Sequence, residues 1–272
     1  MKAKKTIRTY IGAALCLLIA FLCVLPLIYM LLMSFTQSTT TKLHFDSIRL
    51  FDFSNYEFAL TRRGFANGFK NSIIVTVGSC LLVDLVSAMA AYGFEKKPLP
   101  GKEKLFRLYL STMMIPGQVV LISMFVIVNR VGFSNTYWAV ILPMVGAFGI
   151  FLMRQFMEAV PNDLLEAAEI DGSGEARTFL TIVLPLVQPA LITLTVFTFT
   201  GAWNNFLWPL IITNKSEMFT LTLTMSTLSG RNDTNYGLVM AGATLTFLFP
   251  FALYLFLQKR FVEGIALGGV KG

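Results

Sequence analysis

The chain has 272 residues, of which 55% are hydrophobic and only 14% charged. Its mean hydropathy of +0.68 excludes an ordinary soluble domain, in which roughly a quarter of the residues carry a charge, and it indicates an integral membrane protein. The net charge of +7 would suggest a nucleic-acid partner in a soluble chain. Here the Lys and Arg residues flank apolar runs, so they indicate membrane topology and we expect no nucleic acid to bind.

The first apolar run, residues 11–33, follows a basic N-terminal arm and therefore looks like a secretion signal. It is too long for the apolar part of a signal peptide, and it ends without a cleavage site of small residues. We expect this run to remain in the protein as a membrane span.

Six apolar runs are long enough to cross a hydrocarbon core of about 30 Å as helices. They lie near residues 11–33, 72–94, 105–128, 137–157, 184–212 and 237–258. The sequence thus predicts an all-α integral membrane protein with six transmembrane helices, forming a single domain over residues 1–272. Of the 22 Lys and Arg residues, fourteen lie on the side of the two termini, which the positive-inside rule places in the cytoplasm.

The connection 34–71, which this topology places outside, is irregular, and we expect it to form a small cap over the mouth of the pathway. It holds the single histidine, His44. The cysteines Cys16, Cys23 and Cys80 lie inside apolar runs, where a thiol behaves as a small hydrophobe. Because no Cys or His residues are paired at ligand spacing, the sequence argues against a metal site.

An acid, Asp84, lies near the middle of the second span, where a charge costs from about 2.5 kcal/mol upward. It must be protonated, paired or facing water. A functional interpretation makes it a contact in the translocation path. We favour the alternative, a hydrogen bond between helices or to a sister subunit, because single polar residues often serve in helix packing. In an ion-coupled secondary carrier, Asp84 would instead be the ion site.

Between the fourth and fifth spans, residues 158–182 form a polar insertion in which six of the fifteen acids fall within 158–175. Asn162 or Asp163 is a plausible N-cap, with Glu166 completing an arrangement like a capping box. Gly172 can adopt the left-handed conformation that ends a helix. The pattern predicts a short amphipathic helix in water, which either packs on its own bundle or fits a groove of a partner protein.

The fifth span carries more polar residues than exposure to lipid tolerates. Its amides Asn204 and Asn205 lie toward the external half, beside Trp203, so they could offer a ligand with many hydroxyl groups hydrogen bonds and a stacking surface. Alternatively, Trp203 belongs to an interfacial belt and the amides tie helices together. Near the start of this span, Pro185 and Pro189 predict a kink or a helix start.

Several motifs resemble a known family. Glu166-Ala167-Ala168, Asp171-Gly172 and the following Leu184-Pro185 look like the EAA signature of permease subunits in binding-protein-dependent ABC importers. Other stretches resemble the carbohydrate permeases of the maltose type, over essentially the whole chain: Asn71 to Thr76, Trp203 to Leu210, and the tail from Gln258 to Gly272.

This resemblance implies a coupling helix seated in a cleft of a cytoplasmic ATPase, with Glu166, Ala167, Ala168, Asp171 and Gly172 as the coupling residues. It also implies a bacterial cell-membrane location and a set of partners: a second homologous permease, two ABC ATPase subunits and an extracellular sugar-binding protein. The implied function is import of a sugar or oligosaccharide.

The chain lacks the motifs of an enzyme. Its pair Gly101-Lys102 is followed by Glu103, which does not fit a phosphate-binding loop, and no catalytic set of Ser, His and an acid is available. A membrane-embedded enzyme would need acids or histidines clustered within the spans. We therefore expect no cofactor on this chain and ATP with magnesium on the partner ATPases.

Overall fold

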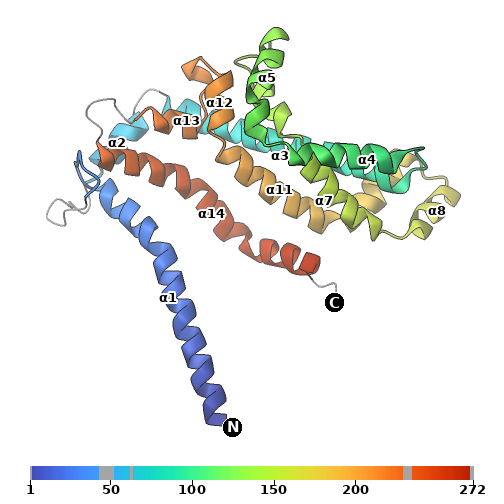
Figure 1. Ribbon diagram of the computed structural model, residues 1–272, viewed down its shortest axis with the longest axis horizontal. Coiled ribbons are helices and arrows are strands. Elements are labelled where there is room, and N and C mark those ends of the chain that lie inside the picture. Colours follow the sequence, from blue (N-terminus) through green and yellow to red (C-terminus); the bar gives the residue numbers. More distant parts are fainter. Residues whose placement is uncertain (1, 43–51, 62–63, 229–234, 270–272) are drawn as a thin grey trace. The chain divides into compact units, whose positions relative to one another are not determined.

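The structure, a computed structural model, describes residues 2–42, 52–61, 64–228 and 235–269 (Figure 1). Side chains are described from residue 11 to residue 256 within these ranges, so His44 and the side chains of the C-terminal tail lie outside the described part. The described residues are helical with no β-strand among them, which confirms the predicted all-α class.

The long helices of the described chain are α1 (Lys2–Ser34), α3 (Phe65–Lys96), α5 (Gly117–Arg130), α7 (Ala147–Glu158), α11 (Gln188–Trp203) and α14 (Tyr236–Gly269). Shorter helices are α2 (Ser54–Thr61), α4 (Lys102–Ser111), α6 (Tyr137–Ile141), α8 (Asn162–Ile170), α9 (Glu175–Thr178), α10 (Leu184–Leu186), α12 (Leu207–Ile212) and α13 (Leu221–Ser226). Tighter turns of 3-10 helix lie at Thr112–Met114, Leu142–Met144 and Ser216–Met218, and Phe179–Val183 forms a π-helix.

The helices group into two compact units, one formed by residues 1–66 and 224–252 and the other by residues 67–223 and 253–272. They are called here the first and the second unit. The single domain expected over residues 1–272 concerns the protein in its membrane and stays a prediction.

Three helical segments are long and apolar enough to cross a membrane, namely Ile11–Ser34, Phe65–Lys96 and Tyr236–Phe256. Three further candidates are helix pairs bent at a short break: Lys102–Met114 with Gly117–Arg130, Tyr137–Met144 with Ala147–Glu158, and Glu175–Leu186 with Gln188–Trp203. By length and composition, the described chain thus offers between three and six spans.

The third predicted run, 105–128, is sharply bent in the structure. Its two helical parts meet at 103°, and the bend falls at Ile115 and Pro116. A proline disfavours helical geometry in the residue before it. Ile115 accordingly has an extended backbone with φ −87° and ψ 117°, so hydropathy alone did not predict this break.

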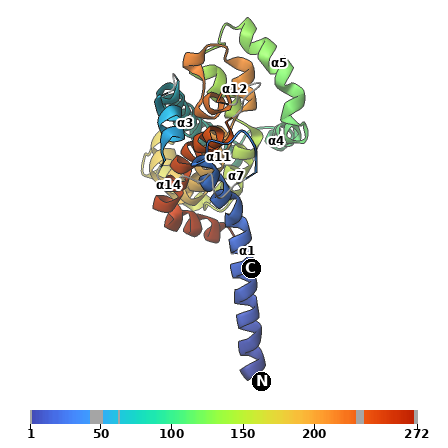
Figure 2. The same ribbon diagram turned by 90° about the vertical axis from the view of Figure 1, so that its left-hand side faces the viewer.

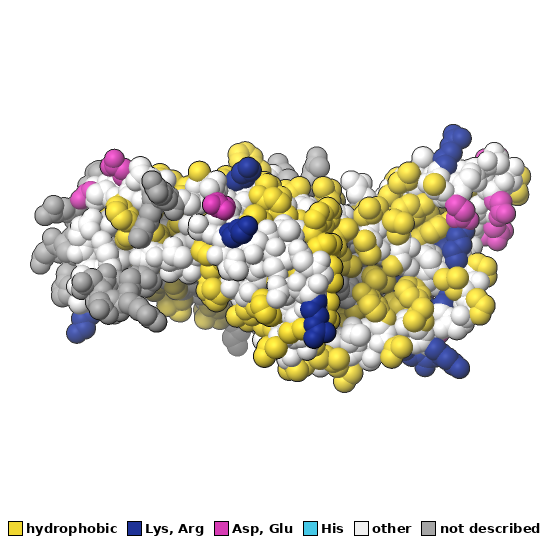
Figure 3. Space-filling view, turned by 90° about the horizontal axis from the view of Figure 1, so that it is seen from above, with side chains coloured by type: hydrophobic (Ala, Val, Ile, Leu, Met, Phe, Trp, Pro, Cys, Tyr) yellow, Lys and Arg dark blue, Asp and Glu magenta, His cyan; other side chains and the backbone are white. Residues whose placement is uncertain are grey.

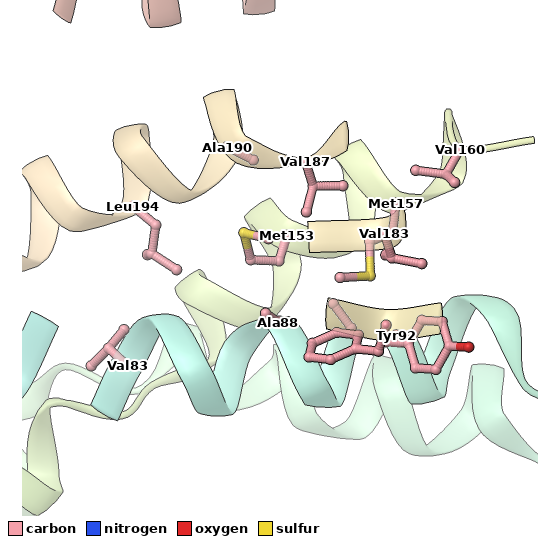
Figure 4. Close-up of a cluster of buried hydrophobic side chains, with 12 residues drawn as sticks. Val83, Ala88, Tyr92, Met153, Met157, Val160, Val183, Val187, Ala190 and Leu194 are labelled. Atoms are coloured by element: carbon pink, nitrogen blue, oxygen red, sulfur yellow. The ribbon is translucent and has the colours of Figure 1, made fainter. Parts of the chain in front are cut away.

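The core of the second unit is an apolar cluster where α3, α7 and the segment from α9 to α11 meet (Figure 4). Met153, Met157 and Val183 are fully buried there, and the ring of Tyr92 reaches the cluster from α3 with its hydroxyl at the edge (Figure 4). Burial of side chains of this size stabilises the unit by about 1.5–3 kcal/mol each. The cluster therefore fixes the place where the polar insertion leaves and rejoins the helices.

At its other end, α3 is held by the amide of Asn71. This side chain donates to the carbonyls of Glu217 (2.7 Å) and Phe219 (2.9 Å) and accepts from the hydroxyl of Tyr137 (2.8 Å). The hydroxyl of Ser72 accepts from the backbone N–H of Leu221 at 2.8 Å. A buried amide that makes three hydrogen bonds specifies one arrangement of its partners, so α3 is tied to the chain after α12.

In the first unit, the connection after α1 contains a helix, α2, where an irregular cap was expected. The buried amide of Asn55 on α2 donates to the carbonyls of Ser34 and Thr36, both at 2.8 Å. These carbonyls end α1 and would otherwise be unsatisfied. The polar residues of this connection thus pair with the end of α1.

Candidate coupling site and translocation path

The polar insertion forms the helix α8, which lies at one end of the second unit (Figure 1). Figure 2 is viewed from the opposite side, so this end points away from the viewer there. The predicted capping box is wrong. The N-cap position is Pro161, without a side-chain cap, and the helix begins at Asn162. The side chain of Asn162 accepts a hydrogen bond from Lys96 instead, at 3.1 Å, so its oxygen serves a contact between elements.

The end of α8 is as predicted. Gly172 has φ +74°, which is the left-handed conformation that glycine adopts without strain. The N–H of Ser173 donates to the carbonyl of Ala168 at 2.8 Å, and the N–H of Gly172 donates to that of Glu169 at 3.0 Å. This pair of bonds defines a Schellman motif, which ends the helix sharply.

The two sides of α8 have different surroundings. Ala168 is buried, and Leu165 packs against the apolar cluster of the second unit. Glu166, Ala167, Asp171 and Gly172 are exposed. One side of the helix therefore packs on its own bundle, as the first alternative stated, and four of the five predicted coupling residues remain accessible.

Apolar side chains lie beside the acids on the exposed side of α8. Ile170 is 86% exposed and Leu164 is 42% exposed. Figure 3 shows acidic side chains gathered with basic ones at the right-hand end of the molecule, the end that carries α8 in Figure 1. Exposed apolar residues with a charged rim are typical of protein-binding surfaces, so this surface suits a protein partner.

Two consecutive lysines, which belong to none of the motifs in the sequence, bind the chain on both sides of α8. Lys96 donates to the carbonyl of Val160 at 2.6 Å, just before α8. Lys97 forms an ion pair with Glu175, just after α8, and the hydroxyl of Tyr92 donates to the other oxygen of Glu175 at 3.0 Å. The pair Lys96-Lys97 at the end of a predicted span is visible in the sequence. Lysines at this place are also common simply as charges that flank a membrane span.

The charge of Lys97 is reinforced by its partner. Burial acts to lower the pKa of Lys97, but the hydrogen bond and the negative charge of Glu175 outweigh burial and hold that pKa above its ordinary value. The ammonium group is therefore charged at physiological pH. Its nitrogen also lies 5.2 Å from the centre of the Tyr92 ring, within range of a cation–π contact.

A second charged cluster joins α3, α4 and α7. Arg154 on α7 donates to Glu95 at 2.9 Å, forms an ion pair with Glu103, and lies over the ring of Phe106 at 4.2 Å. Its side chain is only 13% exposed, and an arginine fork suits two carboxylates. This cluster fixes the connection between α3 and α4 beside the insertion.

The chain after the insertion rejoins the bundle through a bent segment. Helical residues up to Leu186 and the helix α11 meet at 78°, and the break falls at Val187 (φ −96°, ψ 12°), between Pro185 and Pro189. This confirms the predicted kink. Since a proline has no backbone N–H to donate to the preceding turn, the two prolines define where the direction changes.

Asp84 bonds across two helices. Its Oδ2 lies 2.5 Å from the hydroxyl of Thr195 on α11, and Oδ1 is buried without a hydrogen-bond partner among the described residues. The contact is the interhelical hydrogen bond of the favoured alternative. Whether Asp84 also contributes to the translocation path stays a prediction.

The three residues predicted around the end of the fifth span differ in their exposure. Trp203 is 2% exposed and its ring stacks on Phe199 at 6.0 Å. Asn204 is exposed, and its amide donates back to the Thr200 carbonyl at 3.0 Å. Asn205 donates weakly to the sulfur of Met144, at 3.8 Å. In this conformation Asn204 is accessible to a ligand, whereas the Trp203 ring packs in the interior.

Around Asn204, one side of α11 presents polar atoms. Thr200, Gly201 and Asn204 are exposed at helical spacing, together with Phe197. The Phe197 ring packs edge-on against Phe148 of α7 at 5.4 Å. Polar groups at membrane depth are tolerated where they face protein or a water-filled cavity, so this side of α11 favours an interior surface of the assembled protein.

The fold and the exposed insertion define a helical membrane protein that presents a short polar helix between two of its candidate spans. Residues 85–266 match the family described as binding-protein-dependent transport system inner membrane component. The chain belongs to this family, which confirms the predicted resemblance. It is an inner membrane component of a transport system.

Curated relatives extend the match to nearly the full chain. The chain is 34% identical over 261 residues to the arabinooligosaccharides transport system permease protein AraQ of Halalkalibacterium halodurans, covering 93% of each chain. It is also 34% identical over 265 residues to the lactose transport system permease protein LacG of Rhizobium radiobacter, again covering 93% of each.

A solved structure shares the fold. A bacterial ABC transporter chain involved in the import of the acidic polysaccharide alginate superposes with a TM-score of 0.80 at 21% identity, covering 94% of this chain and 96% of that one. At this identity the likeness shows the fold alone. The roles predicted for the coupling and path residues stay predictions.

Proposed function

We propose that this chain is the transmembrane permease subunit of an ATP-driven importer, and that it moves a sugar or oligosaccharide delivered by an extracellular binding protein. It spans a bacterial cell membrane six times with both termini in the cytoplasm. The observation that carries the proposal is the exposed side of α8 in a chain of this transport family. Its apolar residues Leu164 and Ile170 and its acids suit a groove on a partner.

The partners are a second homologous permease, two cytoplasmic ABC ATPase subunits and the binding protein. ATP with magnesium binds the ATPases, and this chain carries no cofactor of its own. A solved relative of this fold is described as a bacterial alginate ABC transporter in complex with an alginate pentasaccharide-bound periplasmic protein, which supports the binding protein as a partner by analogy.

ATP binding closes the ATPase pair and draws the two coupling helices together. The spans then rock from an inward-open to an outward-open arrangement, the binding protein releases its sugar into the path, and ATP hydrolysis resets the cycle. In this chain, Glu166, Ala167, Asp171 and Gly172 contact the ATPase, while the buried Ala168 seats α8 on the bundle.

The names of several relatives support a substrate class. Their names include arabinooligosaccharides, lactose, and melibiose, raffinose and stachyose, which are all sugars of two or more units. We infer a di- or oligosaccharide for this chain. The exposed polar side of α11 with Asn204 supplies hydrogen-bonding groups for hydroxyl-rich cargo.

Uptake into vesicles that contain the purified complex tests the proposal. Arabino-oligosaccharides, lactose and raffinose serve as probes, each with its binding protein. We expect uptake of at least one probe that requires ATP and persists when sodium and proton gradients are dissipated. Uptake that ignores ATP and stops with the gradient would support an ion-coupled carrier using Asp84 and would reject the proposal.

A further inference from the structure

We propose that the C-terminal end of α3 is the anchor that carries movement of the coupling helix to the far side of the protein, with Lys97, directly after α3, and Glu175 as the positioning pair. This inference rests on the proposed function and adds to it a path inside this chain. It assigns a role to residues that lie outside the coupling motif.

The C-terminal end of α3 and the next residue, Lys97, bind the chain on both sides of α8. Lys96 binds the Val160 carbonyl and Asn162 at the start of α8. Lys97 and Tyr92 together bind the two carboxylate oxygens of Glu175 after its end. A segment tied at its entrance and at its exit to one helix end cannot shift without displacing that helix or breaking these bonds.

Apolar packing strengthens the attachment. The Tyr92 ring lies 5.2 Å from the ring of Phe179, which begins the π-helix after α9, and both belong to the buried cluster shared with Val183. Packed interiors transmit strain because they have few voids into which atoms can relax. The charged contacts therefore orient the insertion while the cluster carries its displacement.

The helix α3 is suited to pass this movement on. It runs unbroken for 32 residues, about 48 Å at the rise of an α-helix. The other candidate spans within the second unit are helix pairs bent by 103°, 47° and 78°. An unbroken helix moves as one piece, whereas a broken one absorbs movement at its bend.

The receiving end of α3 is also fixed. Asn71 and Ser72 bind the backbone around Glu217, Phe219 and Leu221. At the opposite end of α3, near the insertion, Lys102 donates to the carbonyls of Glu95 and Lys97, both at 3.3 Å, and so satisfies backbone groups at the helix terminus. Hence α3 links the insertion at one end with the segment 217–221 at the other.

A reporter near the far end of α3 tests this path without knowledge of the sugar. An environment-sensitive fluorophore is attached at Lys70→Cys, an exposed position on α3, in the full complex with Cys16, Cys23 and Cys80 replaced by alanine. The change in fluorescence on addition of ATP and magnesium is measured in this reporter complex and compared with that of the same complex carrying Lys97→Glu, Glu175→Lys or both exchanges. Lys104→Glu, the same charge reversal at an exposed lysine of α4, is the control.

We expect each single reversal to leave the ATPase bound and hydrolysing ATP while the ATP-dependent signal falls at least about fivefold, the lower end of typical coupling between sites. The double exchange and the Lys104→Glu control should keep the signal. Three outcomes overturn the inference: an unchanged signal in the single variants, a double exchange that stays silent, or loss of the ATPase from the single variants. If the reporter complex without charge reversals shows no change in fluorescence with ATP, that result would instead count against the proposed function.

Discussion

At the scale of single residues, the contact between Asp84 and Thr195 raises the question of which of the two side chains donates the proton of their hydrogen bond. The Thr195 hydroxyl lies 2.5 Å from the Asp84 carboxyl and 2.8 Å from the Leu191 carbonyl. A hydroxyl has one proton to donate, so it cannot fill both contacts with an ionised acid. Both are satisfied when Asp84 carries a proton of its own, which also avoids a charge inside a membrane.

If Asp84 carries a proton, Asp84→Asn should be tolerated. The amide is nearly isosteric with the protonated acid and can still bond the Thr195 hydroxyl, so we expect ATP-driven uptake to stay within about threefold of the unmodified level, a change of under 1 kcal/mol. Thr195→Val, which strands the carboxyl, should destabilise the subunit by about 1–3 kcal/mol. Thermal unfolding in detergent and vesicle uptake measure the two effects.

The same variant also distinguishes the two transport classes. If Asp84→Asn folds, binds the ATPase and hydrolyses ATP but takes up no sugar, then Asp84 acts through its charge. The hydrogen-bond account would then be wrong, and an ion at this position would need to be considered again.

At the scale of elements, the sequence predicted where helices end or bend better than it predicted which residues they contact. Gly172 ends α8 because only glycine adopts φ +74° freely, and that information is carried by one residue. The prediction for the start of α8 was wrong because the side chain of Asn162 accepts a hydrogen bond from Lys96, which lies far away in the sequence. Likewise, the bend at Ile115 follows from Pro116, but hydropathy does not register it. The kink between Pro185 and Pro189 was predictable for the same local reason.

The α8 terminus yields a prediction of its own. A side chain at Gly172 would meet no atom within 4 Å, so Gly172→Asp costs the strain of a left-handed backbone, roughly 1–2 kcal/mol, and adds a charge beside the exposed coupling residues. We expect normal membrane insertion but loss of the ATPase on purification. Gly174→Asp adds the same charge two residues later at φ −71°, where no such strain arises, and should retain more ATPase.

Co-purification measures both variants against the unmodified subunit. Recovery of the ATPase with Gly172→Asp at the unmodified yield would contradict a docking role for this end of α8. Equal losses in the two variants would assign the effect to charge and not to the left-handed turn.

At the scale of the whole molecule, the predicted orientation depends on the distribution of charge. The positive-inside rule sets orientation most reliably over short loops, whereas the 34–71 connection is long and itself carries Lys and Arg residues. The number of crossings depends on whether each bent pair traverses the membrane once. These two quantities are linked, because six crossings place the 34–71 connection and the insertion 158–182 on opposite sides.

Labelling with a membrane-impermeant maleimide therefore tests the topology as a whole. Thr39→Cys and Ile170→Cys introduce thiols at exposed positions of the two connections, and the unmodified chain, whose cysteines lie in helices within candidate spans, sets the background. We expect Thr39→Cys to react in intact cells and Ile170→Cys to react only after the membrane is opened. Reaction of both from outside would mean an even number of crossings between them. It would exclude the three crossings expected there and, with them, any contact of α8 with a cytoplasmic ATPase.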